Sequence, residues 1–235
     1  MIKPKLIKQT EKSFIYRIPA YTDLSTTLIE SIKNDGKRDL IFCFPKPKRI
    51  PEDGLRFEQI SDKYILIIIY SAYPSELKQL GKFSGKPKVR LVVPATPKEF
   101  EKFDRDVYAR YFKKPFRKYL SPRYLEEDKK YYSDLLPASN TILIMKGDKR
   151  VGLYSLLKVK RNGRFCKVVP FSFISHDLTK AERLDAHFQI TNWIKNNAAG
   201  LEVSGGVHAA NVRAQRFAIK FGLKPVRVVV ETRVN

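Results

Sequence analysis

The sequence predicts a mixed α/β (α+β) protein with a largely antiparallel sheet flanked by helices and a smaller α/β extension at the N-terminus. Two patterns support this fold class. Short apolar segments typical of strands alternate with segments of helical spacing. Between residues 140 and 174, three strand-like segments follow one another with turn residues between them. The chain of 235 residues is 43% hydrophobic and 12% aromatic, so it can bury a core and is not disordered as a whole.

Residues 1–86 predict the smaller α/β subdomain. We expect a strand, a helix and two buried strands rich in Ile and Phe, over 13–18, 22–32, 39–44 and 64–70. Gly81, Gly85 and Pro87 then interrupt the pattern, and we expect a domain boundary near residue 86.

Residues 87–235 predict the larger domain. The expected order is strand, two helices, three strands, helix, strand, helix and strand, over 88–94, 97–112, 124–135, 140–146, 151–160, 166–174, 180–197, 201–207, 211–221 and 224–233. Gly147-Asp148 and Asn162-Gly163 mark turns, so the three consecutive strands should be antiparallel. Gly222 should end a helix in the left-handed conformation.

The composition is strongly basic, with 46 Lys and Arg against 24 Asp and Glu and a formal net charge of +22. Such a charge attracts polyanions, so nucleic acid, nucleotides, phosphorylated sugars and acidic proteins are candidate partners. A basic surface that is merely solvated is the alternative.

Two further features of the sequence bear on where in the cell the protein is found and on whether it binds a metal. No apolar run approaches the ~18 residues of a membrane span, and no secretory signal is visible, so we expect no membrane partner. Cys43 and Cys166 lack the spacing of a metal site or a disulfide framework. We therefore expect a cytoplasmic protein without a metal.

Two stretches resemble a known family. Residues 207–223 contain an Asn before an Ala- and aromatic-bearing helix that ends in Gly and Leu, as VHAANVRAQRFAIKFGL. Residues 141–153 form two strands whose turn is followed by Val-Gly, as TILIMKGDKRVGL. Together with the element order, they resemble the GCN5-related N-acetyltransferase (GNAT) superfamily over residues 88–235. The layout with an N-terminal extension is loosely similar to amino-sugar acetyltransferases that act on nucleotide-linked sugars.

The resemblance implies an acyl-CoA-dependent N-acyltransferase. It would transfer an acyl group, expected to be acetyl, from acetyl-CoA or another acyl-CoA to the amine of an anionic small molecule such as a nucleotide-linked amino sugar. In the family, the fourth strand splays from the fifth, and its free backbone amides hold the cofactor. The matching cofactor-binding positions are around Phe173 and Ser175, and Asn211 is expected to join them. A homodimer is left open.

The family's pyrophosphate loop has no glycine counterpart in this chain. Residues 177–182 occupy its position, although glycines are what let backbone N–H groups approach a phosphate closely. Thr179 and Glu182 instead match a capping box, in which the helix satisfies its own first N–H groups. The alternative is that Lys180 and Arg183 bind the phosphates through their side chains.

The residue that protonates the leaving thiolate in many family members is also replaced. Many family members have a Tyr four residues before the helix-ending Gly, and Ala218 stands there in this chain. His176 and His208, at the ends of the fourth and fifth strands, are the candidate catalytic residues because an imidazole titrates near neutral pH. A surface or purely hydrogen-bonded role is the alternative for each. Cys166 is interpreted as a packing residue.

Residues 105–124 interleave basic and aromatic side chains, a composition that suits phosphates and bases. The candidate substrate-binding residues are Arg110, Arg117, Lys118 and Tyr119. The alternative is that the segment forms two ordinary helices, with the basic side chains on their solvent-exposed faces and the aromatic side chains on their buried faces. A second basic cluster surrounds Asn162-Gly163, and we interpret it as a solvated edge guarded against aggregation, comprising Lys158, Lys160, Arg161, Arg164 and Lys167.

Two functions thus remain from the sequence. We favour the N-acyltransferase because the region from Asn211 to Gly222 keeps the family pattern. The alternative is a catalytically degenerate member of the fold that binds nucleic acid or another polyanion, which the two departures favour.

Overall fold

A computed structural model describes residues 3–93 and 140–232, apart from 10, 12, 33–38, 52–53, 58–59, 61–62, 81–84, 162, 170–171 and 176. The described residues form two compact units. The first unit combines residues up to Ser71 with those from Gly206 onwards, and the second is built from residues between Ala72 and Gly205. The boundary expected near residue 86 follows chain order, whereas these units are interleaved. The helices expected over 97–112 and 124–135 lie outside the described residues.

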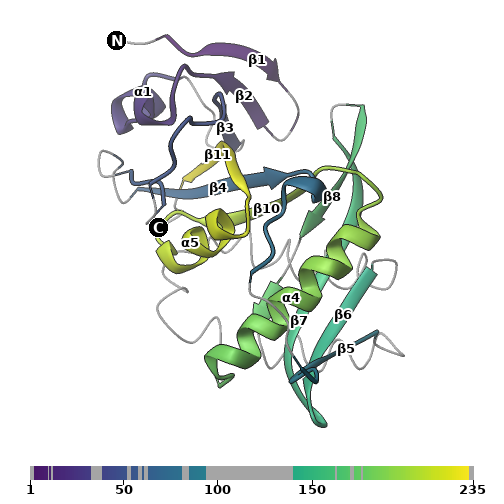
Figure 1. The fold of residues 1–235 in the computed structure, drawn as a ribbon. Helices are drawn as coiled ribbons and strands as arrows, with labels where there is room; N and C mark the ends of the chain where they lie inside the picture. Colours follow the sequence, from purple (N-terminus) through teal and green to yellow (C-terminus); the bar gives the residue numbers. More distant parts are fainter. Residues whose placement is uncertain are drawn as a thin grey trace. The chain divides into compact units, whose positions relative to one another are not determined.

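The first unit is a sheet with its strands in the order β1, β2, β3, β11 and β4 (Figure 1). Their bounds are Lys5–Gln9, Ser13–Arg17, Asp39–Cys43, Lys224–Thr232 and Tyr64–Ala72. The β2–β3 pair is parallel, and the β1–β2, β3–β11 and β11–β4 pairs are antiparallel. Because β11 pairs with both β3 and β4, residues 224–232 are part of the N-terminal sheet.

Apolar side chains from this sheet and two short helices form the core of the first unit. The 3₁₀ helix η1 (Tyr21–Asp23) and α1 (Thr26–Glu30) replace the single helix expected over 22–32, because the Ser25 hydroxyl caps a new helix by accepting from the Leu28 N–H. The most deeply buried core residues include Ile18, Phe42, Ile68, Tyr70 and Val228.

A buried amide side chain connects helix α5 (Val212–Lys220) with the rest of the first unit. Gln215 Oε1 accepts hydrogen bonds from the Leu55 N–H and the Tyr70 hydroxyl, each at 2.8 Å. Its Nε2 donates to the Ala209 carbonyl at 2.6 Å. Gly54 has φ +92°, and a Cβ there would collide with the Gln215 side chain. The network therefore requires glycine at position 54.

The second unit has its strands in the order β10, β8, β7, β6 and β5, and β9 also pairs with β7. Their bounds are Val203–His208, Arg164–Val169, Lys149–Arg161, Asn140–Lys146, Arg90–Val92 and, for β9, Ser172–Ile174. Only the β8–β10 pair of these is parallel. The residues of β10 up to Gly205 belong to this unit. The predicted class, a mixed and largely antiparallel sheet with helices, is confirmed.

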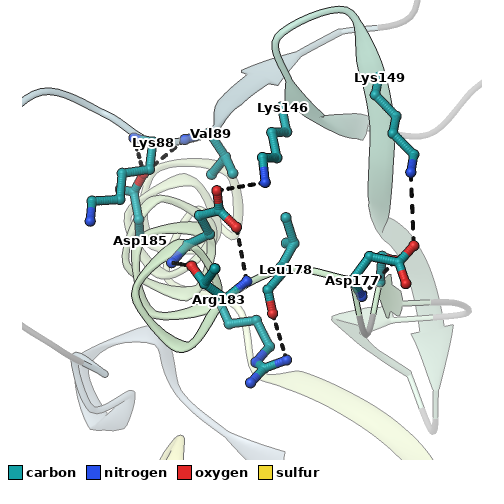
Figure 2. Close-up of polar contacts among 11 residues, drawn as sticks. Lys88, Val89, Lys146, Lys149, Asp177, Leu178, Arg183 and Asp185 are labelled. Carbon is teal, nitrogen blue, oxygen red and sulfur yellow. Dashed lines mark hydrogen bonds and ion pairs between the residues drawn. The ribbon is translucent and has the colours of Figure 1, made fainter.

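Helix α4 (Lys180–Asn197) contacts β5 and β7 of the second unit, and its Ile190 and Ile194 are buried. The Trp193 ring meets the Tyr154 ring of β7 edge to face, with 6.2 Å between centroids. Buried Asp185 accepts from the Lys88 and Val89 N–H groups at 2.6 and 3.0 Å and holds the chain before β5 (Figure 2). A further 3₁₀ helix, η2, covers Pro74–Glu76. No helix among the described residues is long and apolar enough to cross a membrane.

Candidate functional site

The register of β7 shifts where its partner changes from β8 to β9. Leu157 lies opposite Val168, and Tyr154 lies opposite Ser172. From Leu157 to Tyr154 there are three steps along β7, but from Val168 to Ser172 there are four along the facing chain. Between these two pairs the facing chain therefore has one residue more than β7. Such an insertion reverses the direction of the backbone groups and side chains that follow it.

The backbone of β9 therefore presents particular residues on its outer edge. The Ser175 N–H donates to the Val151 carbonyl at 2.7 Å. In an antiparallel pair, hydrogen-bonded and non-hydrogen-bonded positions alternate, so Phe173, opposite Leu153, also directs its N–H towards β7. The N–H groups of Ser172 and Ile174 point away from β7. The free amides that we expected near Phe173 and Ser175 are thus those of Ser172 and Ile174 instead. The extra residue shifts by one position which N–H groups point away from β7.

Among the described strands, β10 pairs with β8 and not with β9. Within the second unit, Val203 and Gly205 pair in parallel with Lys167 and Val169 of β8. Strand β9, which continues the same chain segment after β8, has β7 as its partner among the described strands. The outward N–H groups of Ser172 and Ile174 are therefore the candidate main-chain donors.

The first turn of α4 is closed by its own side chains (Figure 2). The Thr179 hydroxyl accepts from the Glu182 N–H at 3.3 Å, and Glu182 Oε2 accepts from the Thr179 N–H at 2.8 Å. The predicted capping box is confirmed. Lys146 Nζ lies 2.8 Å from Glu182 Oε1, and this hydrogen bond, together with the bond from Thr179, lowers the pKa of Glu182 to about 2. A carboxylate thus interacts with the positive end of the helix, where the family binds a phosphate.

Replacing Glu182 with glutamine tests this arrangement. A carboxyl with a folded pKa of about 2 and an ordinary value of 4.5 stabilises the fold above pH 4.5 and loses this contribution as the pH falls towards 2. Gln keeps the capping geometry, so Glu182→Gln should lower the Tm by only about 1–2 °C at pH 6. Calorimetry should find this difference largely gone at pH 2.5, and an equal difference at both pH values would contradict the assignment.

Lys180 and Arg183 lie on this first turn, and their side chains differ in their surroundings. Lys180 is exposed. Arg183 Nη1 donates to the Leu178 carbonyl at 2.7 Å, so part of its guanidinium is already engaged. Nearby, the Ser175 hydroxyl donates to Asp177 Oδ2 at 3.1 Å, and Lys149 Nζ lies 3.9 Å from the same oxygen. The surroundings of the turn hold charges of both signs.

His208 and Asn211 come together in the first unit at the start of α5. The Asn211 N–H donates to the His208 carbonyl at 2.8 Å, and the Asn211 side chain caps α5 by accepting from the Ala214 N–H at 3.1 Å. His208 Nδ1 accepts from the Ala210 N–H at 3.1 Å. A neutral imidazole that accepts at Nδ1 carries its hydrogen on Nε2, where it can donate a hydrogen bond.

The end of α5 also matches the sequence prediction. Gly222 has φ +93° directly after the last turn, and Ala218 is buried in the core of the first unit. The family's Tyr would not fit there without displacing core side chains.

Comparisons with known proteins give similarity in structure only. No family model and no curated protein matches the sequence. A functionally unknown conserved protein from Staphylococcus epidermidis is similar over 100% of this chain and 96% of its own, with 13% identity and a TM-score of 0.50. A GCN5-related N-acetyltransferase from Kribbella flavida is similar over 94% and 82%, with 11% identity and a TM-score of 0.46. The likeness is one of fold.

Several predicted site residues lie outside the described residues. They are His176, Arg110, Arg117, Lys118 and Tyr119, and of Phe173 only the backbone is described. Cys166 is buried against Leu157 and Val168, which confirms its packing role. Sequence reasoning missed Lys146 and Lys149, although they flank the predicted Gly147-Asp148 turn, because nothing local indicates that this turn meets the start of α4.

Proposed function

We propose that the protein is an acyl-CoA-dependent N-acyltransferase that transfers an acetyl group to the amine of an anionic acceptor, such as a nucleotide-linked amino sugar. The observation that carries this proposal is the edge of β9. An extra residue after β8 directs the N–H groups of Ser172 and Ile174 away from β7. Outward main-chain donors on this strand are what a thioester cofactor of this fold family requires.

The proposed reaction needs few groups from the protein. The acceptor nitrogen attacks the thioester carbonyl carbon, the C–S bond breaks, and CoA leaves as a thiolate that takes up a proton, while the nitrogen loses one. The Ile174 N–H would stabilise the negative charge that develops on the carbonyl oxygen. The proton that the nitrogen loses can return to the thiolate, and His208 and His176 are the candidates from the sequence for carrying it.

Side chains would bind the phosphates of CoA in place of a glycine loop. Exposed Lys180 and the guanidinium of Arg183 are the proposed contacts, because the Glu182 carboxylate already satisfies the Thr179 N–H. Asn211 would contribute to the cofactor site, as the resemblance implies. Arg110, Arg117, Lys118 and Tyr119 would hold the anionic acceptor, a role that rests on their residue types.

An acetyl-transfer assay tests the proposal. With acetyl-CoA and a nucleotide-linked amino sugar, we expect release of the CoA thiol and an acetylated sugar detectable by mass spectrometry. The double variant Lys180→Ala/Arg183→Ala should raise the KM for acetyl-CoA about tenfold with little change in kcat.

The matched control is Lys46→Ala/Arg49→Ala, an exposed pair with the same spacing and charge in the first unit, which should behave like the wild type. Release of thiol without an acetylated acceptor would reject this acceptor class. No release with any amine would reject the acyltransferase function itself.

A further inference from the structure

The outer half of the β7–β8 hairpin is a two-stranded ribbon. Strand β6 pairs with β7 only as far as Leu156, and β10 pairs with β8 only from Lys167 onwards. Among the described strands, residues 159–161 of β7 and 164–166 of β8 therefore pair only with each other, and Lys158 lies opposite Lys167 where β10 begins to pair. We call residues 158–161 and 163–166 the basic ribbon.

The two faces of the basic ribbon differ in character. Val159 lies opposite Cys166, and with Leu157 and Val168 they form a small apolar cluster. On the other face, Lys160 lies opposite Phe165 and Lys158 lies opposite Lys167. Side chains alternate between the faces of a strand, so this second face gathers lysines around one aromatic ring.

The aromatic ring on this face is exposed and surrounded by positive charge. Phe165 has 52% of its surface accessible. Lys158 Nζ lies 4.4 Å and Lys160 Nζ lies 5.9 Å from the centroid of its ring. The sequence from Lys149 to His176 contains seven Lys and Arg and no Asp or Glu. Protection of a strand edge would explain the lysines but not an exposed phenylalanine between them.

We propose that the basic ribbon binds single-stranded nucleic acid, with Lys158 and Lys160 contacting phosphates and Phe165 stacking on a base. Ammonium groups neutralise the backbone, and an exposed ring stacks on any base, whose faces are accessible in a single strand but covered in a duplex. An acidic protein would use the lysines but would leave the ring without a partner. This binding does not depend on acyl transfer.

Fluorescence anisotropy with a labelled oligothymidine of about 20 nucleotides tests the role of the lysines. Wild-type protein should bind at low salt, and Lys158→Ala/Lys160→Ala should make the slope of log affinity against log salt shallower by about 1.4. The matched control is Lys46→Ala/Lys48→Ala, two exposed lysines with the same spacing in the first unit, which should keep the wild-type slope.

Two substitutions that leave the net charge unchanged test the role of the Phe165 ring. Phe165→Leu should weaken binding at least about fivefold, while Phe165→Tyr, which retains an aromatic face, should bind like the wild type. Both variants should unfold at the wild-type Tm, because Phe165 is half exposed.

Four results would overturn the proposal: no binding at low salt, equal losses in the two lysine pairs, equal affinities for Phe165→Leu and Phe165→Tyr, or equally tight binding of a duplex or of polyglutamate. Equal losses would mean that the net charge of +22 alone attracts the oligonucleotide.

Discussion

Replacing Ile174 with proline should weaken acetyl-CoA binding about tenfold or more and leave the fold intact. Proline removes the N–H of Ile174, which points away from β7, and the bond from Ser175 to Val151 is unaffected. A ligand oxygen that loses its hydrogen-bond donor forfeits about 1–3 kcal/mol, which is enough for a change of this size. Calorimetric titration measures the affinity.

Two variants serve as controls for this result. Ile174→Ala keeps the N–H and removes only the side chain, so it should bind acetyl-CoA like the wild type. Ser175→Pro removes the bond to Val151 and should lower the Tm. If Ile174→Pro binds acetyl-CoA with unchanged affinity, the outward amide is not part of the cofactor site.

Replacing Gln215 with methionine should destabilise the first unit by about 3 kcal/mol or more. Methionine has a similar volume but leaves the Leu55 N–H, the Tyr70 hydroxyl and the Ala209 carbonyl without the partner they have now. Each buried polar group left without a hydrogen bond costs about 1–3 kcal/mol. Urea denaturation, followed by tyrosine and tryptophan fluorescence, measures the loss.

The same network provides a graded control. Tyr70→Phe removes one hydrogen bond from Gln215 and should cost about 1 kcal/mol. Gly54→Ala should be clearly destabilising because it combines a φ of +92° with a collision against Gln215. A Gln215→Met protein as stable as the wild type would show that the network contributes nothing.

Local sequence signals predicted the elements where the structure depends on local chemistry. The strand 140–146 and the helix 180–197 have the predicted bounds, since the Thr179–Glu182 capping box fixes where α4 begins. Gly222 adopts the predicted left-handed conformation after α5. These features depend on residues only a few positions apart.

Features set by distant parts of the chain could not be predicted in this way. Strand β1 is exposed along its whole length, so no apolar alternation indicates it. The pairing of β11 with β3 and β4 depends on residues about 150 to 190 positions apart. In the candidate site, one extra residue before Ser172 decides which amides of β9 point outwards, and a sequence pattern does not reveal the register that fixes it.

The most direct test of the cofactor site is a thermal-shift titration of the wild-type protein with acetyl-CoA. A ligand that binds only the folded protein raises its stability in proportion to the logarithm of the ligand concentration once binding is saturated. We expect a Tm that keeps rising with acetyl-CoA, with a smaller rise in Ile174→Pro than in Ile174→Ala. A wild-type Tm that does not change up to millimolar acetyl-CoA would contradict it.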